Sequence, residues 1–303
     1  MDFTAVLDAL GSSAGYVAGG FVVVVLVLIF WAFRQGRAIE FLPPRIGEQP
    51  AGPQKASPPP ASVQPNIYEV DNAMAFYGAI APNYDQRNSV NLLATHLEVI
   101  SRIEEFGVAK PGLRVLDLGG GTGQNVATHF FNQGNICWTY VDFCPGMVEQ
   151  LQQHLAGRPL YQHLQVHVED INRVHLRVQP QSQDIILLNL VLSSMPLLPD
   201  FRRLAALLAP GGRMIISDIN PLYTHAHPLY TATAADGMQV AMRTKAVQPL
   251  EIVTRARDAE LQLSDMSQIG AAEISYSFVA VFETAVQLSS RTDRPGDSKA
   301  TLR

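Results

Sequence analysis

The sequence predicts an α/β fold, in which a mostly parallel sheet with helices on both faces follows one membrane-spanning helix. The first observation is a short apolar run, residues 114–118, that ends in closely spaced glycines and is followed by a helix-forming segment. That pattern is typical of a buried parallel strand that turns into a helix. The second is the alternation of further apolar runs with helical segments, which favours a parallel sheet. The third is an uncharged stretch, residues 14–33, with about the 20 apolar residues that a helix needs to cross a bilayer.

The composition sets the limits of this interpretation. The chain has 303 residues, of which 47% are hydrophobic and 16% charged, enough for one sizeable core with appendages. A net charge of −5 gives no basic surface, so nucleic acid is not expected as a partner. The two cysteines, Cys137 and Cys144, are too few for a disulfide scaffold or a metal site. We expect them to be buried small hydrophobic residues in a reducing compartment.

The N-terminal stretch predicts a membrane anchor rather than a cleaved signal peptide. Its leader, residues 1–13, carries Asp2 and Asp8 and no lysine or arginine, whereas a signal peptide begins with a basic segment and has a shorter apolar core. A buried soluble helix is the alternative for residues 14–33. By the positive-inside bias, the arginines that follow place the C-terminal side of the stretch in the cytoplasm: Arg34, Arg37 and Arg45.

Two segments flank the predicted globular domain, residues 67–288. Residues 34–66 are rich in proline, glycine, alanine and serine, a composition that cannot bury a core and is typical of a partly extended linker. The tail, residues 289–303, is expected to be disordered. The linker keeps the domain close to the membrane without fixing its orientation.

The domain begins with a segment, residues 67–106, that is expected to be helical with a break at residues 80–85. The later part has apolar residues at the three-to-four spacing of an amphipathic helix: Val90, Leu93, Leu97, Ile100 and Ile103. The first strand, residues 114–118, follows. A helix is expected from near Gln124 through Phe131.

The glycine turn after the first strand narrows the choice of cofactor. Gly119, Gly121 and Gly123 form Gly-x-Gly-x-Gly, which is not the Gly-x-Gly-x-x-Gly of a dinucleotide site, because Gln124 fills the third position. A nicotinamide oxidoreductase is therefore disfavoured. A phosphate-binding loop would need Lys followed by Ser or Thr, and neither is present.

With Asp117 two residues ahead of the first glycine, the stretch reads Asp-x-Gly-x-Gly-x-Gly. It resembles the first motif of the class I S-adenosylmethionine-dependent methyltransferases. The resemblance implies a Rossmann-like, seven-stranded sheet with an antiparallel C-terminal strand pair. It also implies that the glycine turn holds the methionine portion of S-adenosylmethionine.

Upstream, residues 76–88 resemble the N-terminal signature of ubiquinone- and menaquinone-type C-methyltransferases, with Phe76, Tyr77, Tyr84 and Asp85 at the matching positions. In that group the segment forms a cap over the cofactor. A helix–turn–helix packing unit remains the alternative for any one of these residues.

The second strand, residues 138–141, ends at Asp142, about twenty residues beyond the turn. An acidic residue at the tip of the second strand can accept hydrogen bonds from both ribose hydroxyls, and the resemblance gives Asp142 that role with Phe143 beside the adenine. A solvated strand-end carboxylate is the alternative. A helix opens at Pro145, since proline is favoured in a first turn.

The third and fourth strands complete the predicted cofactor site. Residues 164–168 form the third strand, and the resemblance implies that Asp170 faces the adenine amine while Ile171 packs on the ring. The fourth strand, residues 184–190, ends where the methyl group should lie, since ligands sit beyond the carboxyl ends of parallel strands. Asn189 at that end is a further candidate for cofactor binding.

The absence of several known motifs restricts the chemical class of the methyl acceptor. The fourth strand is not followed by the Asn/Asp-Pro-Pro-Tyr of adenine or glutamine-amide methylases, nor by the Pro-Cys of cytosine C5 chemistry. The match to the Gly-x-Arg-Asn of quinone C-methyltransferases is also poor. A quinone acceptor is therefore not implied.

The last third of the domain predicts the acceptor side and the closing strands. A helix over residues 198–208 leads through Ala-Pro-Gly-Gly, residues 209–212, into a fifth strand over residues 213–218, an arrangement that resembles the family's late motif. The following insertion, residues 221–231, holds the candidates for a general base, because their pKa can be brought near working pH: Tyr223, His225 and His227. A helix over residues 250–259 and strands over residues 261–269 and 274–283 fit the closing antiparallel pair.

These motifs together predict a membrane-anchored methyltransferase that moves the methyl group of S-adenosylmethionine to a small, lipophilic acceptor. The alternative is a membrane-tethered scaffold whose methyltransferase fold has lost catalysis. The intact Asp117, Gly121 and Asp142 disfavour that alternative.

Overall fold

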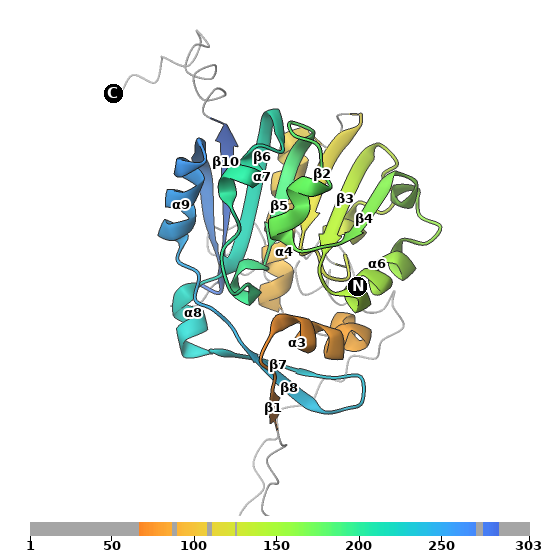
Figure 1. Ribbon diagram of the computed structural model, residues 1–303, viewed down its shortest axis with the longest axis vertical. Helices are drawn as coiled ribbons and strands as arrows, with labels where there is room; N and C mark the ends of the chain where they lie inside the picture. Colours follow the sequence, from red (N-terminus) through yellow and green to blue (C-terminus); the bar gives the residue numbers. More distant parts are fainter. Residues whose placement is uncertain (1–66, 87–89, 108–110, 125, 271–274, 285–303) are drawn as a thin grey trace, which may run out of the picture. The chain divides into compact units, whose positions relative to one another are not determined.

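The computed structural model describes residues 67–86, 90–107, 111–124, 126–270 and 275–284 (Figure 1). The predicted leader (1–13), membrane span (14–33), linker (34–66) and tail (289–303) lie outside these residues. Within the described ranges, no helix combines the length and the apolar character needed to cross a membrane.

The described chain builds a central sheet of seven strands in the order β4-β3-β2-β5-β6-β10-β9. The first five strands of this order are parallel, and β10 runs antiparallel to both of its neighbours. This confirms the predicted sheet and its antiparallel C-terminal pair. The strands are β2 Leu113–Leu118, β3 Ile136–Asp142, β4 Leu164–Val168, β5 Gln183–Asn189, β6 Leu208–Ile219, β9 Leu261–Ile269 and β10 Ser277–Thr284.

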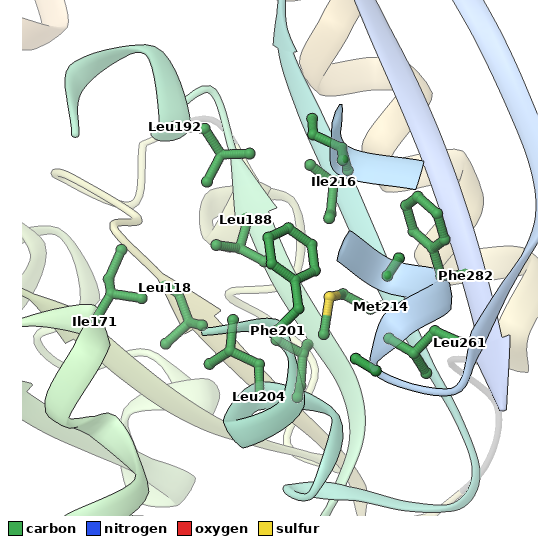
Figure 2. Packing of buried hydrophobic residues seen from close by; sticks show 14 of the residues in the cluster. Leu118, Ile171, Leu188, Leu192, Phe201, Leu204, Met214, Ile216, Leu261 and Phe282 are labelled. Atoms are coloured by element: carbon green, nitrogen blue, oxygen red, sulfur yellow. The ribbon is translucent and has the colours of Figure 1, made fainter. Parts of the chain in front are cut away.

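Two apolar clusters cover the two faces of the sheet, because successive residues of a strand point to opposite faces. Leu116 and Leu118 of β2 pack in the cluster that includes residues of α7 (Phe201–Ala205) and α9 (Pro249–Asp258), which Figure 2 shows. Leu113 and Val115 pack in the other cluster. That second cluster includes residues of α4 (Val90–Gly107), α5 (Val126–His129) and α6 (Pro145–Leu155).

A second sheet of three strands, in the order β1-β8-β7, lies beyond the carboxyl ends of the central parallel strands together with α3 (Ala73–Ile80) (Figure 1). Its strands are β1 Ile67–Glu69, β7 Leu229–Thr233 and β8 Gln239–Arg243. Phe76 and Ile80 of α3 pack on Val240 and Met242 of β8 in a third apolar cluster. This small layer positions the functional site, since it closes the open end of the sheet.

The prediction of a helix starting at Ile67 was wrong. Ile67 to Glu69 form strand β1 because β8, about 170 residues further on, supplies a parallel partner, with Ile67 beside Gln239. The helix starts later, where the Asn72 side chain accepts a hydrogen bond from Ala75 N at 2.9 Å, as an N-cap does. The predicted break is present as the 3₁₀ helix η1 (Ala81–Gln86).

Three further elements differ from the prediction. The helix expected over residues 198–208 spans only Phe201–Ala205, because Asp200 caps it by accepting from Arg202 N and Arg203 N. The helix expected through Phe131 ends at His129. The Pro-Gly-Gly turn lies inside β6, where the register with β5 shifts; a Cβ on Gly212 would stand 2.9 Å from Gln183 O.

Candidate functional site

A cavity of about 1620 Å³ lies at the carboxyl ends of the parallel strands, where the sheet of an α/β protein forms its ligand crevice. The segments that follow β2, β3, β4 and β5 line one side of it, and α3 with the second sheet lines the other. All nine predicted cofactor-binding residues line this cavity: Asp117, Gly119, Gly121, Gly123, Asp142, Phe143, Asp170, Ile171 and Asn189. Its volume exceeds the 300–1,000 Å³ of an ordinary small-molecule pocket, which leaves room for two ligands.

The glycine turn needs glycine at each alternate position. Gly119, Gly121 and Gly123 have φ of +73°, +65° and +68°, a left-handed conformation that side chains disfavour. A Cβ on Gly119 would overlap Val191, and one on Gly123 would overlap Leu151. On Gly121 a Cβ would meet only the Tyr84 ring, at 4.0 Å. The backbone at Gly121 is therefore open to close approach by a ligand.

Asp142 connects the end of β3 to this turn. Its Oδ2 accepts a hydrogen bond from Gly121 N at 3.0 Å and its Oδ1 one from Cys144 N at 2.8 Å. Burial raises the pKa of Asp142 to about 6. A carboxylate offers about four acceptor positions, so Asp142 can still accept from a ligand in the cavity that it lines.

Two other buried side chains, Asp117 and Tyr140, contact the glycine turn from strands β2 and β3. Burial raises the pKa of Asp117 to about 7, and its side chain lies beneath Gly120. The Tyr140 hydroxyl donates to Gly121 O, and burial raises the pKa of Tyr140 well above its ordinary value. The turn is thus fixed by β2 and β3 before any ligand binds.

A polar cluster, formed by Asp85, Thr122 and His154, joins the predicted cap to the turn. The Thr122 hydroxyl donates to Asp85 Oδ1 at 2.5 Å, and His154 Nε2 lies 3.2 Å from Asp85 Oδ2. His154 Nδ1 lies 3.1 Å from the carbonyl oxygen of Thr122. His154, in α6, therefore contacts both η1 and the glycine turn.

The residues expected at the adenine come together on one wall. Phe143, Asp170 and Ile171 line the cavity next to the turn. Asp170 Oδ1 accepts from Asn172 N at 2.7 Å and so starts the 3₁₀ helix η3 (Ile171–Leu176). Ile171 is buried. The predicted roles of these three residues stay predictions, but their placement is compatible with them.

Asn189 is held at the end of β5 by two side chains. Its Oδ1 accepts from Ser217 Oγ at 2.6 Å, and its Nδ2 lies 2.9 Å from His96 Nδ1. His96, on α4, is buried and lines the cavity. The next residue, Leu190, has φ of +56°, a strained conformation of the kind that occurs at functional sites.

The candidates for a general base separate in the structure. Tyr223 of α8 (Pro221–Ala226) and His227 line the cavity, with ring centroids 4.5 Å apart. His225 is exposed and is not one of the cavity-lining residues. In the described residues, no group of three His, Cys, Asp or Glu side chains is arranged to hold a metal ion.

Several cavity residues were not recognised in the sequence. Tyr276, just before β10, packs on Tyr223 with ring centroids 4.8 Å apart. Tyr77, which the sequence placed in the cap segment, joins α3 to the segment after β5, because its hydroxyl lies 2.8 Å from Ser194 Oγ. His96 is one of several polar residues on the amphipathic helix α4. Neither Tyr276 nor His96 is marked by a local pattern, because only the tertiary fold brings them to the cavity.

Comparisons with known proteins agree with this arrangement. A family model described as a methyltransferase domain matches residues 92–249. No curated protein matches the chain.

Among solved structures, the CcbJ methyltransferase of Streptomyces caelestis is similar at 18% identity and a TM-score of 0.52, over 69% of this chain and 98% of that one. An S-adenosylmethionine-dependent methyltransferase of Clostridium acetobutylicum is similar at 12% identity and a TM-score of 0.50, over 69% and 98% of the two chains. At these sequence identities, the similarities show a shared fold and nothing more.

Proposed function

The chain belongs to the class I S-adenosylmethionine-dependent methyltransferases, and from that premise we propose that it methylates a small, lipophilic acceptor at a membrane. S-adenosylmethionine is the cofactor of this family. When bound, it supplies a methyl group already activated on a sulfonium. The protein's own residues then have to bind the cofactor, align the acceptor and exclude water.

The residues of the cavity fit the cofactor. The open backbone at Gly121 supports assigning the methionine portion to the glycine turn. Asp142, on the adjacent strand, has acceptor capacity left for the ribose hydroxyls. Phe143, Asp170 and Ile171 form a continuous wall for the adenine. Asn189, fixed between Ser217 and His96, is assigned to the methyl end.

The remaining part of the cavity supports a lipophilic acceptor. Its wall beyond Asn189 carries Met195, Leu197 and Leu229 together with tyrosines: Tyr77, Tyr223, Tyr230 and Tyr276. Such a surface favours apolar and aromatic molecules with few polar groups. Tyr223 and His227 are the candidates for a base, which only a hydroxyl or carbon-acid acceptor requires.

The uncharged residues 14–33 support a single membrane span, with the domain in the cytoplasm. The proposal is that this anchor keeps the cavity close to acceptors dissolved in the bilayer.

The observation that carries the proposal is the joint placement of the glycine turn and Asp142 in one cavity. The test is to incubate the full chain with methyl-labelled S-adenosylmethionine and membranes, then separate lipids, pigments and proteins. We expect label in the lipid or pigment fraction. Label in the protein fraction alone contradicts the proposed acceptor, and cofactor binding without transfer to any fraction indicates the scaffold.

A further inference from the structure

The mouth of the cavity carries exposed apolar side chains from three separate parts of the chain. Met74 of α3 is 43% exposed, Leu197 is 74% exposed and Leu229 of β7 is 38% exposed, and all three line the cavity. We call these three residues the apolar rim. Single exposed apolar residues are ordinary on a protein surface. Three that converge on one opening, from positions up to 155 residues apart, indicate an interaction site.

Strand β1 brings the N-terminal part of the chain to the same layer. Tyr68 and Ile67 of β1 are 64% and 53% exposed, and Glu69, at the end of β1, lines the cavity with the rim. The residues that precede β1 include the uncharged stretch 14–33 and the linker 34–66. An extended linker of that length reaches up to about 100 Å. The linker alone therefore does not determine which face of the domain is turned towards the membrane.

Basic side chains accompany the rim. Arg243, at the end of β8, and Lys245 are exposed and line the cavity. Two acidic residues, Glu69 and Asp71, also line the cavity, and Arg243 pairs with Glu69 at 3.3 Å. Apolar side chains beside lysine and arginine suit the boundary between acyl chains and anionic headgroups.

We propose that the apolar rim docks on the lipid bilayer, so that the mouth of the cavity faces the membrane. The proposal rests on the membrane location proposed above and does not depend on methyl transfer. A second copy of the chain fits this surface less well. A stable dimer buries about 800 Å² on each partner, whereas the rim is a few side chains interrupted by charges.

The test measures the environment of a fluorophore on the rim in the full chain. The prediction that both cysteines are buried was wrong for Cys137, which is exposed, and correct for Cys144. Cys137 is therefore first replaced by Cys137→Ser. Leu229→Cys is then labelled with an environment-sensitive fluorophore and reconstituted in phosphatidylcholine–phosphatidylglycerol vesicles that contain nitroxide-labelled lipid. Docking predicts a blue-shifted emission that the nitroxide lipid quenches.

Leu263→Cys is the matched control. Leu263 is 39% exposed, against 38% for Leu229, and lies on the edge strand β9. Its distance from the cavity side of the sheet makes it a control. Leu263 is six residues, about 20 Å along a strand, from the end of β9 on that side, where Ile269 pairs with Ser277. We expect quenching at position 229 to exceed that at position 263 several-fold. Equal quenching at the two positions, or none at either, overturns the proposal.

Two further outcomes separate this proposal from others. A blue shift in detergent that grows with protein concentration, without lipid, means that a second copy covers the rim and overturns it. Calorimetry with S-adenosylmethionine on the unlabelled full chain tests the proposed function independently. Cofactor binding without quenching at position 229 would leave the methyltransferase assignment intact and remove the docking surface.

Discussion

Asp142 has two tasks in the same place. Its carboxylate holds Gly121 N and Cys144 N, and it lines the cavity on the side where the ribose is expected. An acidic side chain is suited to both, because a carboxylate accepts several hydrogen bonds at once.

We therefore predict that Asp142→Asn weakens binding of S-adenosylmethionine by about 1.5–3 kcal/mol, the strength of a hydrogen bond to a charged group. This corresponds to about a 10- to 150-fold rise in Kd, measured by calorimetry. Asp236→Asn is the control, since Asp236 also accepts from a backbone N–H, of Met238 at 3.0 Å, but lies outside the cavity-lining set. An unchanged Kd for Asp142→Asn would mean that another residue binds the ribose.

The raised pKa of Asp117 predicts that the free energy of unfolding depends on pH. Burial raises its pKa from 3.8 to about 7, so the folded chain binds this proton more tightly than the unfolded chain does. The resulting stabilisation is complete below about pH 4 and is lost as the pH rises through about 7. Between about pH 5 and pH 8 the free energy of unfolding should fall by a few kcal/mol from this residue.

The measurement is Tm by circular dichroism for the full chain in mild detergent, at both pH values. Asp117→Asn should reduce the difference in Tm, and Asp236→Asn should preserve it. Asp218, whose pKa burial raises to about 6, adds to the wild-type slope in the same direction. A wild-type Tm that rises towards pH 8, or an Asp117→Asn slope equal to that of the wild type, would contradict this account.

At the residue scale, the sequence predicted which residues at the ends of β2 and β3 line the cavity better than it predicted those of the opposite wall. Gly119, Gly121 and Asp142 follow predictable strands directly, so their position along the chain also fixes their position in space. His96 and Tyr276 reach the cavity only through the packing of α4 and the turn before β10. No local pattern marks such residues.

At the scale of the elements, the Asp85–Thr122–His154 cluster couples η1 to the glycine turn. We predict that His154→Gln weakens cofactor binding by about 1 kcal/mol, as expected for the loss of a typical hydrogen bond. The Gln amide places its polar atoms differently from the imidazole ring, so it cannot keep both contacts, with Asp85 and with the carbonyl oxygen of Thr122. Calorimetry with S-adenosylmethionine measures the effect.

His129→Gln is the control for that change. His129 also contacts a carboxylate, with its Nε2 2.8 Å from Glu104 Oε1, but it does not line the cavity. Equal losses of affinity in the two variants would show a general effect on stability rather than a role for the cluster.

The segment of helix α8 allows the two candidates for a general base that line the cavity to be compared with His225, which does not line it. We predict that Tyr223→Phe or His227→Gln lowers the rate of methyl transfer to the membrane fraction by about 10²–10⁴-fold, the usual contribution of a general base. His225→Gln, in the same segment but outside the cavity wall, should leave the rate nearly unchanged. Cofactor affinity should be the same in all three. If none of the variants is impaired, neither Tyr223 nor His227 acts as a general base.

The elements of the central sheet were predictable because each strand is a short apolar run bounded by turns. Strand β9 agrees with the prediction to the residue. Strand β1 was mistaken for helix, since three residues carry no periodicity and gain their structure from Gln239 and its neighbours. The short helix α7 starts later than predicted because Asp200 caps its N-terminus, which outweighs helix propensity.

At the scale of the whole described domain, two layers with different origins form the site. The central sheet provides the wall that carries the glycine turn and Asp142. The second sheet and α3 provide the opposite wall (Figure 1). That layer joins β1 to a hairpin inserted after β6, a long-range pairing that the sequence pattern does not reveal. The wall formed by the second sheet and α3 is thus the part of the cavity that only the tertiary fold reveals.

The central claim is that this cavity binds S-adenosylmethionine through the glycine turn and Asp142. The most direct measurement is an experimental structure of the full chain with S-adenosylhomocysteine. We expect the ribose hydroxyls within hydrogen-bonding distance of the Asp142 carboxylate and the homocysteine portion against the backbone at Gly121. A ligand bound elsewhere, or a cavity filled by side chains, would contradict the account.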